Sequence, residues 1–141
     1  MFTIFVLMLL IILLFILYVT YHNADGVYFS NTNFIYCKNE YACFHEIGHL
    51  LDYKKNNISL TTEFDEAINE YFYRMVFEIY YDNATIFDIK TYGELQILYE
   101  RNNYNHGLSV FVANSEIYAT IYAKYNGVTD DMPIEFQRFY K

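Results

Sequence analysis

Residues 45–49 read His-Glu-Ile-Gly-His, and these side chains at this spacing are suited to metal chemistry. Residues four apart on a helix lie on one face about one turn from each other, so His45 and His49 can both reach a single Zn²⁺. A zinc ion with an open coordination position brings the pKa of its bound water toward neutrality. Glu46 would then take a proton from that water as it attacks a carbonyl carbon. The pattern predicts a zinc site with the metal ligands His45 and His49 and the catalytic base Glu46.

The flanking residues favour a packed helix over chance occurrence of the pattern on a solvated surface. Asn39 can cap the helix, and Glu40 in its first turn suits the helix dipole. We expect Gly48 to lie on the side of the helix opposite the ligands, where a small residue permits close helix packing. Asp52 follows His49 by three residues, and we expect it to accept a hydrogen bond from a ligand histidine.

Zinc in such a site needs a third protein ligand, which must come from elsewhere in the chain. Two regions offer one. Glu66 and Glu70 lie one helical turn apart in residues 65–70, and 20 residues separate His49 from Glu70, close to the spacing in thermolysin-like gluzincins. Glu116 stands in the first turn of a second candidate helix, whose remaining surface is apolar and aromatic. The spacing alone leaves these alternatives open.

The elements that must position these groups are mostly helical. Two β-prone runs around a polar turn predict a hairpin over residues 26–37, and residues 40–54 form the motif helix. Further helices are expected after a cap at Ser59 or Thr62 to about residue 81, from Thr91 to about residue 101, and over residues 115–126 with Asn114 as the cap. A short helix follows Pro133. The fold class expected is α+β, α-rich with a small β-hairpin.

Residues 1–20 are almost wholly apolar and carry no charge, which predicts a single transmembrane anchor before a domain over residues 21–141. A cleaved signal peptide is the alternative. No Lys or Arg occurs before Lys38, so charge gives little information on sidedness. A disulfide between Cys37 and Cys43 would favour the extracytoplasmic side, and two idle thiols are the alternative. The net charge of −8 argues against nucleic-acid binding.

The chain also carries a succession of motifs from one known family. His45-Glu46-Ile47-Gly48-His49-Leu50-Leu51-Asp52 is followed by Glu116-Ile117-Tyr118-Ala119 and then by Pro133 before Phe136. This order resembles the catalytic domain of anthrax-lethal-factor-like zinc metallopeptidases, which include secreted Pro-Pro endopeptidases. The resemblance covers about residues 40–140. It implies a minimal zincin-like fold of gluzincin type, Zn²⁺ held by His45, His49 and Glu116, catalysis by Glu46, and a peptide or protein substrate.

The chain departs from the family pattern in three places. Thr120 replaces a second glutamate of the ligand helix, and Ser109 stands where the family has a catalytic tyrosine; Tyr104 or His106 in the preceding loop could take that place. The sheet before the motif helix is short, so the hairpin would have to hold the substrate strand, or a partner protein would complete the cleft. The sequence thus predicts a membrane-anchored zinc metalloendopeptidase. The alternative is a non-catalytic membrane interaction protein with structural or absent zinc.

Overall fold

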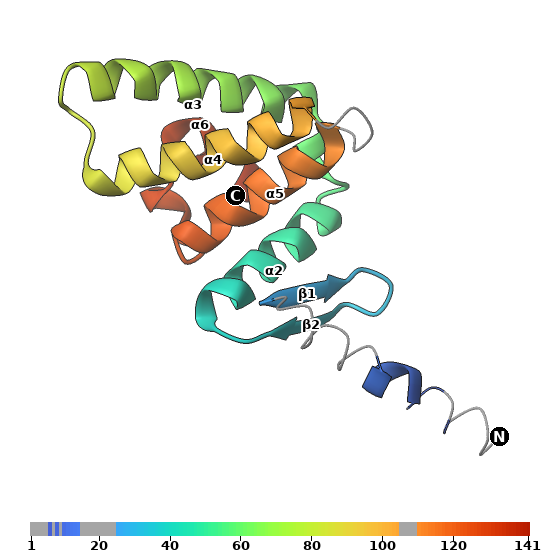
Figure 1. The fold of residues 1–141 in the computed structure, drawn as a ribbon. Helices are drawn as coiled ribbons and strands as arrows, with labels where there is room; N and C mark the ends of the chain where they lie inside the picture. The colour runs from blue at the N-terminus through green and yellow to red at the C-terminus, as the bar shows by residue number, and fades with distance from the viewer. Residues whose placement is uncertain (1–5, 7, 9, 15–24, 105–109) are drawn as a thin grey trace.

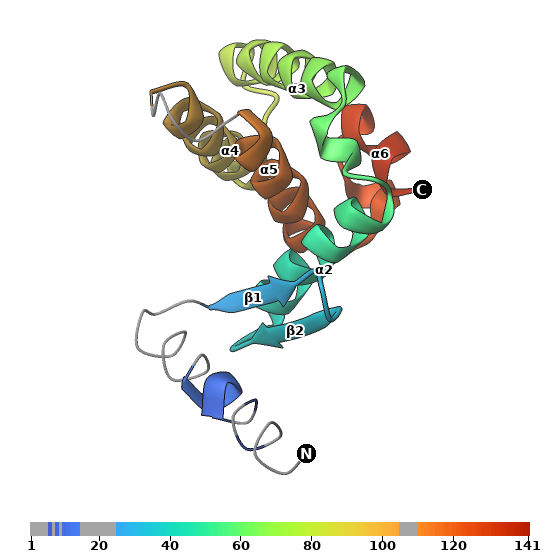
Figure 2. The same ribbon diagram turned by 90° about the vertical axis from the view of Figure 1, so that its right-hand side faces the viewer.

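The structure is a computed structural model that describes residues 6, 8, 10–14, 25–104 and 110–141. It is mostly helical and contains one small antiparallel sheet, so the α-rich α+β class is confirmed. The hairpin lies at one end of the molecule and α3 (Thr62–Tyr80) at the other, with α2 (Glu40–Lys54), α5 (Val110–Lys124) and α4 (Ile86–Tyr104) between them (Figures 1 and 2).

The hairpin is formed by β1 (Gly26–Phe29) and β2 (Phe34–Cys37), as the sequence predicts. The register pairs Gly26 with Cys37 at one end and Phe29 with Phe34 at the turn. Asn33 in the turn has a φ of 52°, in the left-handed region that asparagine tolerates better than most residues. Both strands pack on α2, so the hairpin covers one side of the motif helix (Figure 2).

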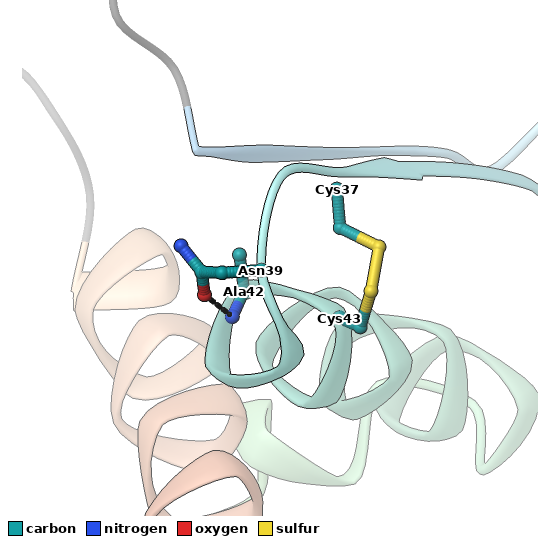
Figure 3. The surroundings of a disulfide bond; sticks show 4 residues. All are labelled: Cys37, Asn39, Ala42 and Cys43. Carbon is teal, nitrogen blue, oxygen red and sulfur yellow. Dashed lines mark hydrogen bonds between the residues drawn. A yellow bond between two sulfur atoms is a disulfide. The ribbon is translucent and has the colours of Figure 1, made fainter.

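Local signals set the boundaries of α2 as expected. The Asn39 side chain accepts a hydrogen bond from the backbone N–H of Ala42 at 2.8 Å, and Lys54 lies in the last turn. Cys37, the last residue of β2, forms a disulfide with Cys43 in the first turn of α2 (Figure 3). The pairing that the sequence left open is therefore present. It ties the end of the hairpin to the start of the motif helix.

The hydrophobic core lies between α3, α5 and α6 (Ile134–Tyr140), with the 3₁₀ turn η1 (Ile58–Leu60) leading from α2 into α3 and η2 (Thr129–Asp131) leading into α6. The rings of Phe64 on α3 and Phe136 on α6 are 5.9 Å apart between centroids. Pro133 precedes α6 as predicted, and Phe136 and Phe139 are both buried. The other large side chains of this core are Ile68, Tyr71, Met75, Leu95, Ile117, Tyr118 and Ile121.

Three helix starts differ from the prediction. The N-cap of α3 is Thr61, whose hydroxyl accepts from the N–H of Phe64. α4 begins at Ile86, before the predicted Thr91, because Thr85 and Asp88 form a capping box: the Thr85 hydroxyl accepts from the Asp88 N–H and the Asp88 carboxylate accepts from the Thr85 N–H.

The start of α5 also lies earlier than predicted. This helix begins at Val110, so Asn114 lies inside it and is not a cap. Its end agrees with the prediction better, because α5 stops at Lys124 and Gly127 follows with a φ of +72°. The Gly127 N–H donates to the carbonyl of Tyr122, which satisfies one of the free carbonyls at the helix end.

The predicted anchor over residues 1–20 falls largely outside the described residues. Within the part of the chain that the structure describes, no helix is both long and apolar enough to cross a bilayer.

Candidate metal centre

Helices α2 and α5 bring three potential metal ligands together. His45 Nε2 lies 3.2 Å from Glu116 Oε2, and His49 Nε2 lies 3.4 Å from Glu116 Oε1. The two histidine Nε2 atoms are 3.2 Å apart. One donor atom from each residue falls within 4.8 Å of the others, which is compact enough for all three to bind one ion. Glu116 comes from a helix that begins 56 residues after the end of α2.

Gly48 allows α5 to approach this closely. A Cβ atom at Gly48 would lie 2.6 Å from the backbone Cα of Ala119, well inside van der Waals contact. The expected close packing is therefore present, but the expected face was wrong. Gly48 is three residues after His45, which on a helix is only about 60° away, so it borders the ligand face. It packs against the same helix that carries Glu116.

The alternative third ligands do not reach the motif helix. Glu66 and Glu70 are exposed on α3, and neither belongs to the cluster formed by His45, His49 and Glu116. The thermolysin-like spacing of Glu70 is therefore not realised. Of the candidate loop residues, His106 lies outside the described residues, as does Ser109. For Tyr104, the last residue of α4, only the backbone is described.

Glu46 is held under the hairpin. Its side chain is 7% exposed, and a Cβ atom at Gly26 would lie 2.7 Å from Glu46 Cγ, so β1 passes directly over the carboxylate. Burial raises the pKa of Glu46, against the opposing effects of His49, His45 and a hydrogen bond from the backbone N–H of Tyr28. A carboxylate whose pKa lies above its usual range is a better proton acceptor, as a general base requires.

The side chain that contacts the Nδ1 atom of His49 is Ser115, whereas we expected Asp52 to accept a hydrogen bond from a ligand histidine. The Nδ1 atom of His49 lies 3.2 Å from Ser115 Oγ, which orients the ring so that Nε2 faces the cluster. Asp52 is buried and instead accepts hydrogen bonds from the N–H and the hydroxyl of Ser59, at 2.9 and 2.6 Å. Its expected role was therefore wrong: Asp52 fixes η1 against the end of α2. Ser115 was missed because only its neighbour Glu116 stood out in the sequence.

The electrostatics of the cluster match a cation site. Burial alone would raise the pKa of Glu116, but hydrogen bonds and charge from His45 and His49 outweigh it and lower this pKa to about 2. For His49, burial acts to lower the pKa, and the hydrogen bond and charge of Glu116 outweigh it, so the pKa is raised. The negative charge of Glu116 thus attracts a proton onto His49, and a metal ion would take the place of that proton.

The residues present fit zinc. Two imidazole nitrogens and a carboxylate oxygen are ligands that Zn²⁺ prefers, and three of them leave one position for water. The side chains of His45, His49 and Glu116 are 20%, 18% and 40% exposed, so the cluster faces solvent on one side.

The exposed side opens into a cleft of about 840 Å³ between the hairpin, α2, α4 and α5. Both the cluster and Glu46 line it. One wall is β1 with the preceding Asp25, and Tyr41 also lines the cleft, where its hydroxyl donates to Glu94 on α4 at 3.3 Å. Tyr41 lies four residues before His45 and thus on the same helix face, a signal that the sequence contained. The cleft is also lined by Val27, Tyr53, Leu98 and Thr120.

Comparisons with known proteins found no relative of this chain: no family model, no curated protein and no solved structure matches it.

Proposed function

We propose that this chain is a zinc-dependent metallopeptidase that hydrolyses peptide bonds with Glu46 as the general base. The observation that carries the proposal is the meeting of His45, His49 and Glu116 within 4.8 Å on the wall of a cleft that Glu46 also lines. The resemblance of the motifs to anthrax-lethal-factor-like peptidases points the same way. We further propose that the domain is a minimal version of the zincin-like fold, of gluzincin type.

The openness of the cluster favours catalysis over a structural metal. Structural zinc sites in proteins have four protein ligands and are closed to solvent. Among the described residues the cluster has three, and it faces a cleft large enough for several side chains of a peptide. Zinc bound here would polarise water and the substrate carbonyl. Glu46 would accept the proton of the attacking water and pass it to the leaving amine.

Within the described residues, no strand pairs with the edge of β1 that faces away from β2, and this edge is placed to hold a peptide. The carbonyl of Asp25 accepts from the N–H of Lys38, which continues the ladder toward β2. Because alternate residues of an antiparallel strand direct their backbone groups to opposite edges, those of Gly26 and Tyr28 point away from β2. The Tyr28 N–H accordingly reaches Glu46. A substrate strand added at this edge would lie across the cleft, bound by the remaining backbone groups.

For the location of the protein we propose a single-pass membrane attachment through residues 1–20, with the catalytic domain on the extracytoplasmic side. The apolar sequence supports the attachment. The Cys37–Cys43 disulfide supports the sidedness, because such bonds persist in oxidising compartments.

The test is zinc stoichiometry and peptide cleavage on the full chain in detergent, comparing wild type with Glu46→Gln, Glu116→Gln and Glu70→Gln. We expect about one zinc per chain in wild type, Glu46→Gln and Glu70→Gln, and strongly weakened binding in Glu116→Gln. Cleavage of a peptide library should be lost in Glu46→Gln and kept in Glu70→Gln.

Two results would contradict the proposal. Cleavage by Glu46→Gln at the wild-type rate would contradict the proposed role of Glu46 as the general base. Zinc that raises the melting temperature while no peptide is cleaved above the Glu46→Gln background would indicate a non-catalytic interaction protein with a structural metal.

A further inference from the structure

We propose that the hairpin and its disulfide form a positioning unit for Glu46 that is separate from the metal site, so that reduction of Cys37–Cys43 stops hydrolysis while the metal stays bound. This inference rests on the proposed function and adds regulation to it. In the reduction, the S–S bond breaks and the two cysteines take up two electrons and two protons. A thiol-class reductant supplies these and is itself oxidised to a disulfide.

The metal cluster does not depend on the hairpin. His45 and His49 are held on α2 and Glu116 on α5, and these helices pack directly through Gly48 and Ala119. Ser115, which supports His49, is also on α5. Each of these contacts joins the two helices without involving β1 or β2, so loosening the hairpin leaves the three donor atoms in place.

The position of Glu46 does depend on the hairpin. Gly26 lies against its side chain so closely that a methyl group at that position would overlap Cγ, and the backbone N–H of Tyr28 points toward its carboxylate. Both contacts come from β1, and Glu46 as a whole residue is only 7% exposed although it lines the cleft. Without β1 the carboxylate would be free to rotate into the solvent of the cleft.

The hairpin is too small to hold this position unaided. Each strand has four residues, and within the described part of the chain the sheet has only these two strands. An isolated two-stranded hairpin is at best marginally stable in water, so this one depends on its packing against α2 and on the disulfide. One ring contact between the hairpin and α2 is the tilted pair of Tyr28 and Tyr53, whose centroids are 6.5 Å apart.

The disulfide compensates for the small size of the hairpin by linking it covalently to α2. It joins the last residue of β2 to the first turn of α2 across a separation of six residues, with 5.1 Å between the Cα atoms (Figure 3). Because β1 is bound to β2 in register, holding the end of β2 on α2 also holds Gly26, the partner of Cys37, over Glu46. The bond therefore acts on the residue paired with Gly26, which itself lies against the side chain of Glu46.

The experiment uses full-length, zinc-loaded protein in detergent, before and after reduction by a phosphine, which does not remove zinc as a dithiol does. The disulfide oxidises the phosphine to its oxide; one water supplies the oxygen atom of the oxide, and its two protons complete the thiols. A variant with both Cys37→Ser and Cys43→Ser mimics the reduced state, and Gly26→Ala forces β1 and the Glu46 side chain apart with the disulfide intact. The readouts are zinc per chain, kcat and KM separately, and hydrogen exchange of the Tyr28 amide.

We expect reduction and the double serine variant each to lower kcat at least tenfold with zinc still at one per chain and KM changed little. Exchange of the Tyr28 amide should accelerate at least tenfold, and reoxidation should restore both values. Gly26→Ala should lower kcat similarly while keeping zinc. The same phosphine should change nothing in the double serine variant, which controls for other effects of the reagent.

Unchanged kcat and unchanged Tyr28 protection after reduction would overturn the inference, as would loss of zinc in parallel with activity. If the oxidised wild type cleaves no peptide, the proposed peptidase function fails on its own. The positioning claim is then still decided by zinc retention together with exchange at Tyr28.

Discussion

Replacing Gly48 with alanine tests whether the contact between α2 and α5 sets the metal site. The new Cβ would lie 2.6 Å from the Cα of Ala119, where ordinary contact begins at 3.4 Å. The obstacle is backbone, which cannot rotate away as a side chain can. The helices must therefore separate by about 1 Å, which is within the range of overpacking that costs roughly 1–3 kcal/mol.

Two effects of opposite sign decide the outcome for stability. Alanine favours the helix over glycine by about 1 kcal/mol, so the free energy of unfolding should fall by only about 0–2 kcal/mol. Zinc affinity should respond more strongly. Glu116 moves with α5, and a displacement of about 1 Å far exceeds the roughly 0.2 Å that ligand distances tolerate. We expect zinc affinity to fall at least about tenfold, on the scale of mutations that disturb ligand orientation.

Gly93 on α4 provides a matched control, because a Cβ atom there would meet no atom within 4 Å. Gly93→Ala should raise stability by up to about 1 kcal/mol and leave zinc affinity unchanged. Zinc affinity is measured by competition with a chromophoric chelator, and stability by urea unfolding of the metal-free proteins. Wild-type zinc affinity in Gly48→Ala, together with a gain in stability like that of Gly93→Ala, would refute the packing argument.

Three further predictions concern groups around the cluster. Ser115→Ala should lower zinc affinity about tenfold in the same chelator competition, because the His49 ring loses its partner at Nδ1; equal affinity would show that this contact does not orient the ring. Asp52→Ala should lower the free energy of unfolding in urea by about 1–3 kcal/mol, because two buried donors of Ser59 lose their acceptor, with one zinc per chain retained. Zinc affinity should fall about tenfold per pH unit once the pH drops below the raised pKa of His49, because zinc and the proton compete for that ring. The Glu116 carboxylate, with its pKa lowered to about 2, should add nothing to this slope above pH 4, and a titration with a flat profile from pH 8 to 5 would contradict the assignment.

The motif helix and the hairpin could be predicted because the signals for them are local. Asn39, the pattern of residues 45–49 and the polar turn before Phe34 each act within a few residues, and the structure has all three features. The start of α4 was missed because two similar patterns compete: Thr85 with Asp88, and Thr91 with Glu94. The first forms the cap, and Thr91 becomes a fully buried residue inside the helix.

The third ligand could not be chosen from spacing, because the choice depends on how distant helices pack. α5 is buried on several sides at once, at Ile117, Tyr118, Ala119 and Ile121, so its sequence has no single apolar face from which its orientation could be read. Its rotation is set instead by the contact of Ala119 with Gly48. Only the resemblance of the motifs to a known family favoured Glu116 in advance.

The distance along the chain between the two halves of the cluster has a consequence for the order of assembly. His49 and the residue next to Glu116 are 66 positions apart in sequence, with α3 and α4 between them. A nascent chain therefore carries the complete His-Glu-Ile-Gly-His pattern long before it has a third ligand. High metal affinity, and any hydrolysis that depends on it, would begin only after α5 has been synthesised and has docked on Gly48. The late arrival of one glutamate thus postpones the assembly of the three-residue cluster until α5 has been made.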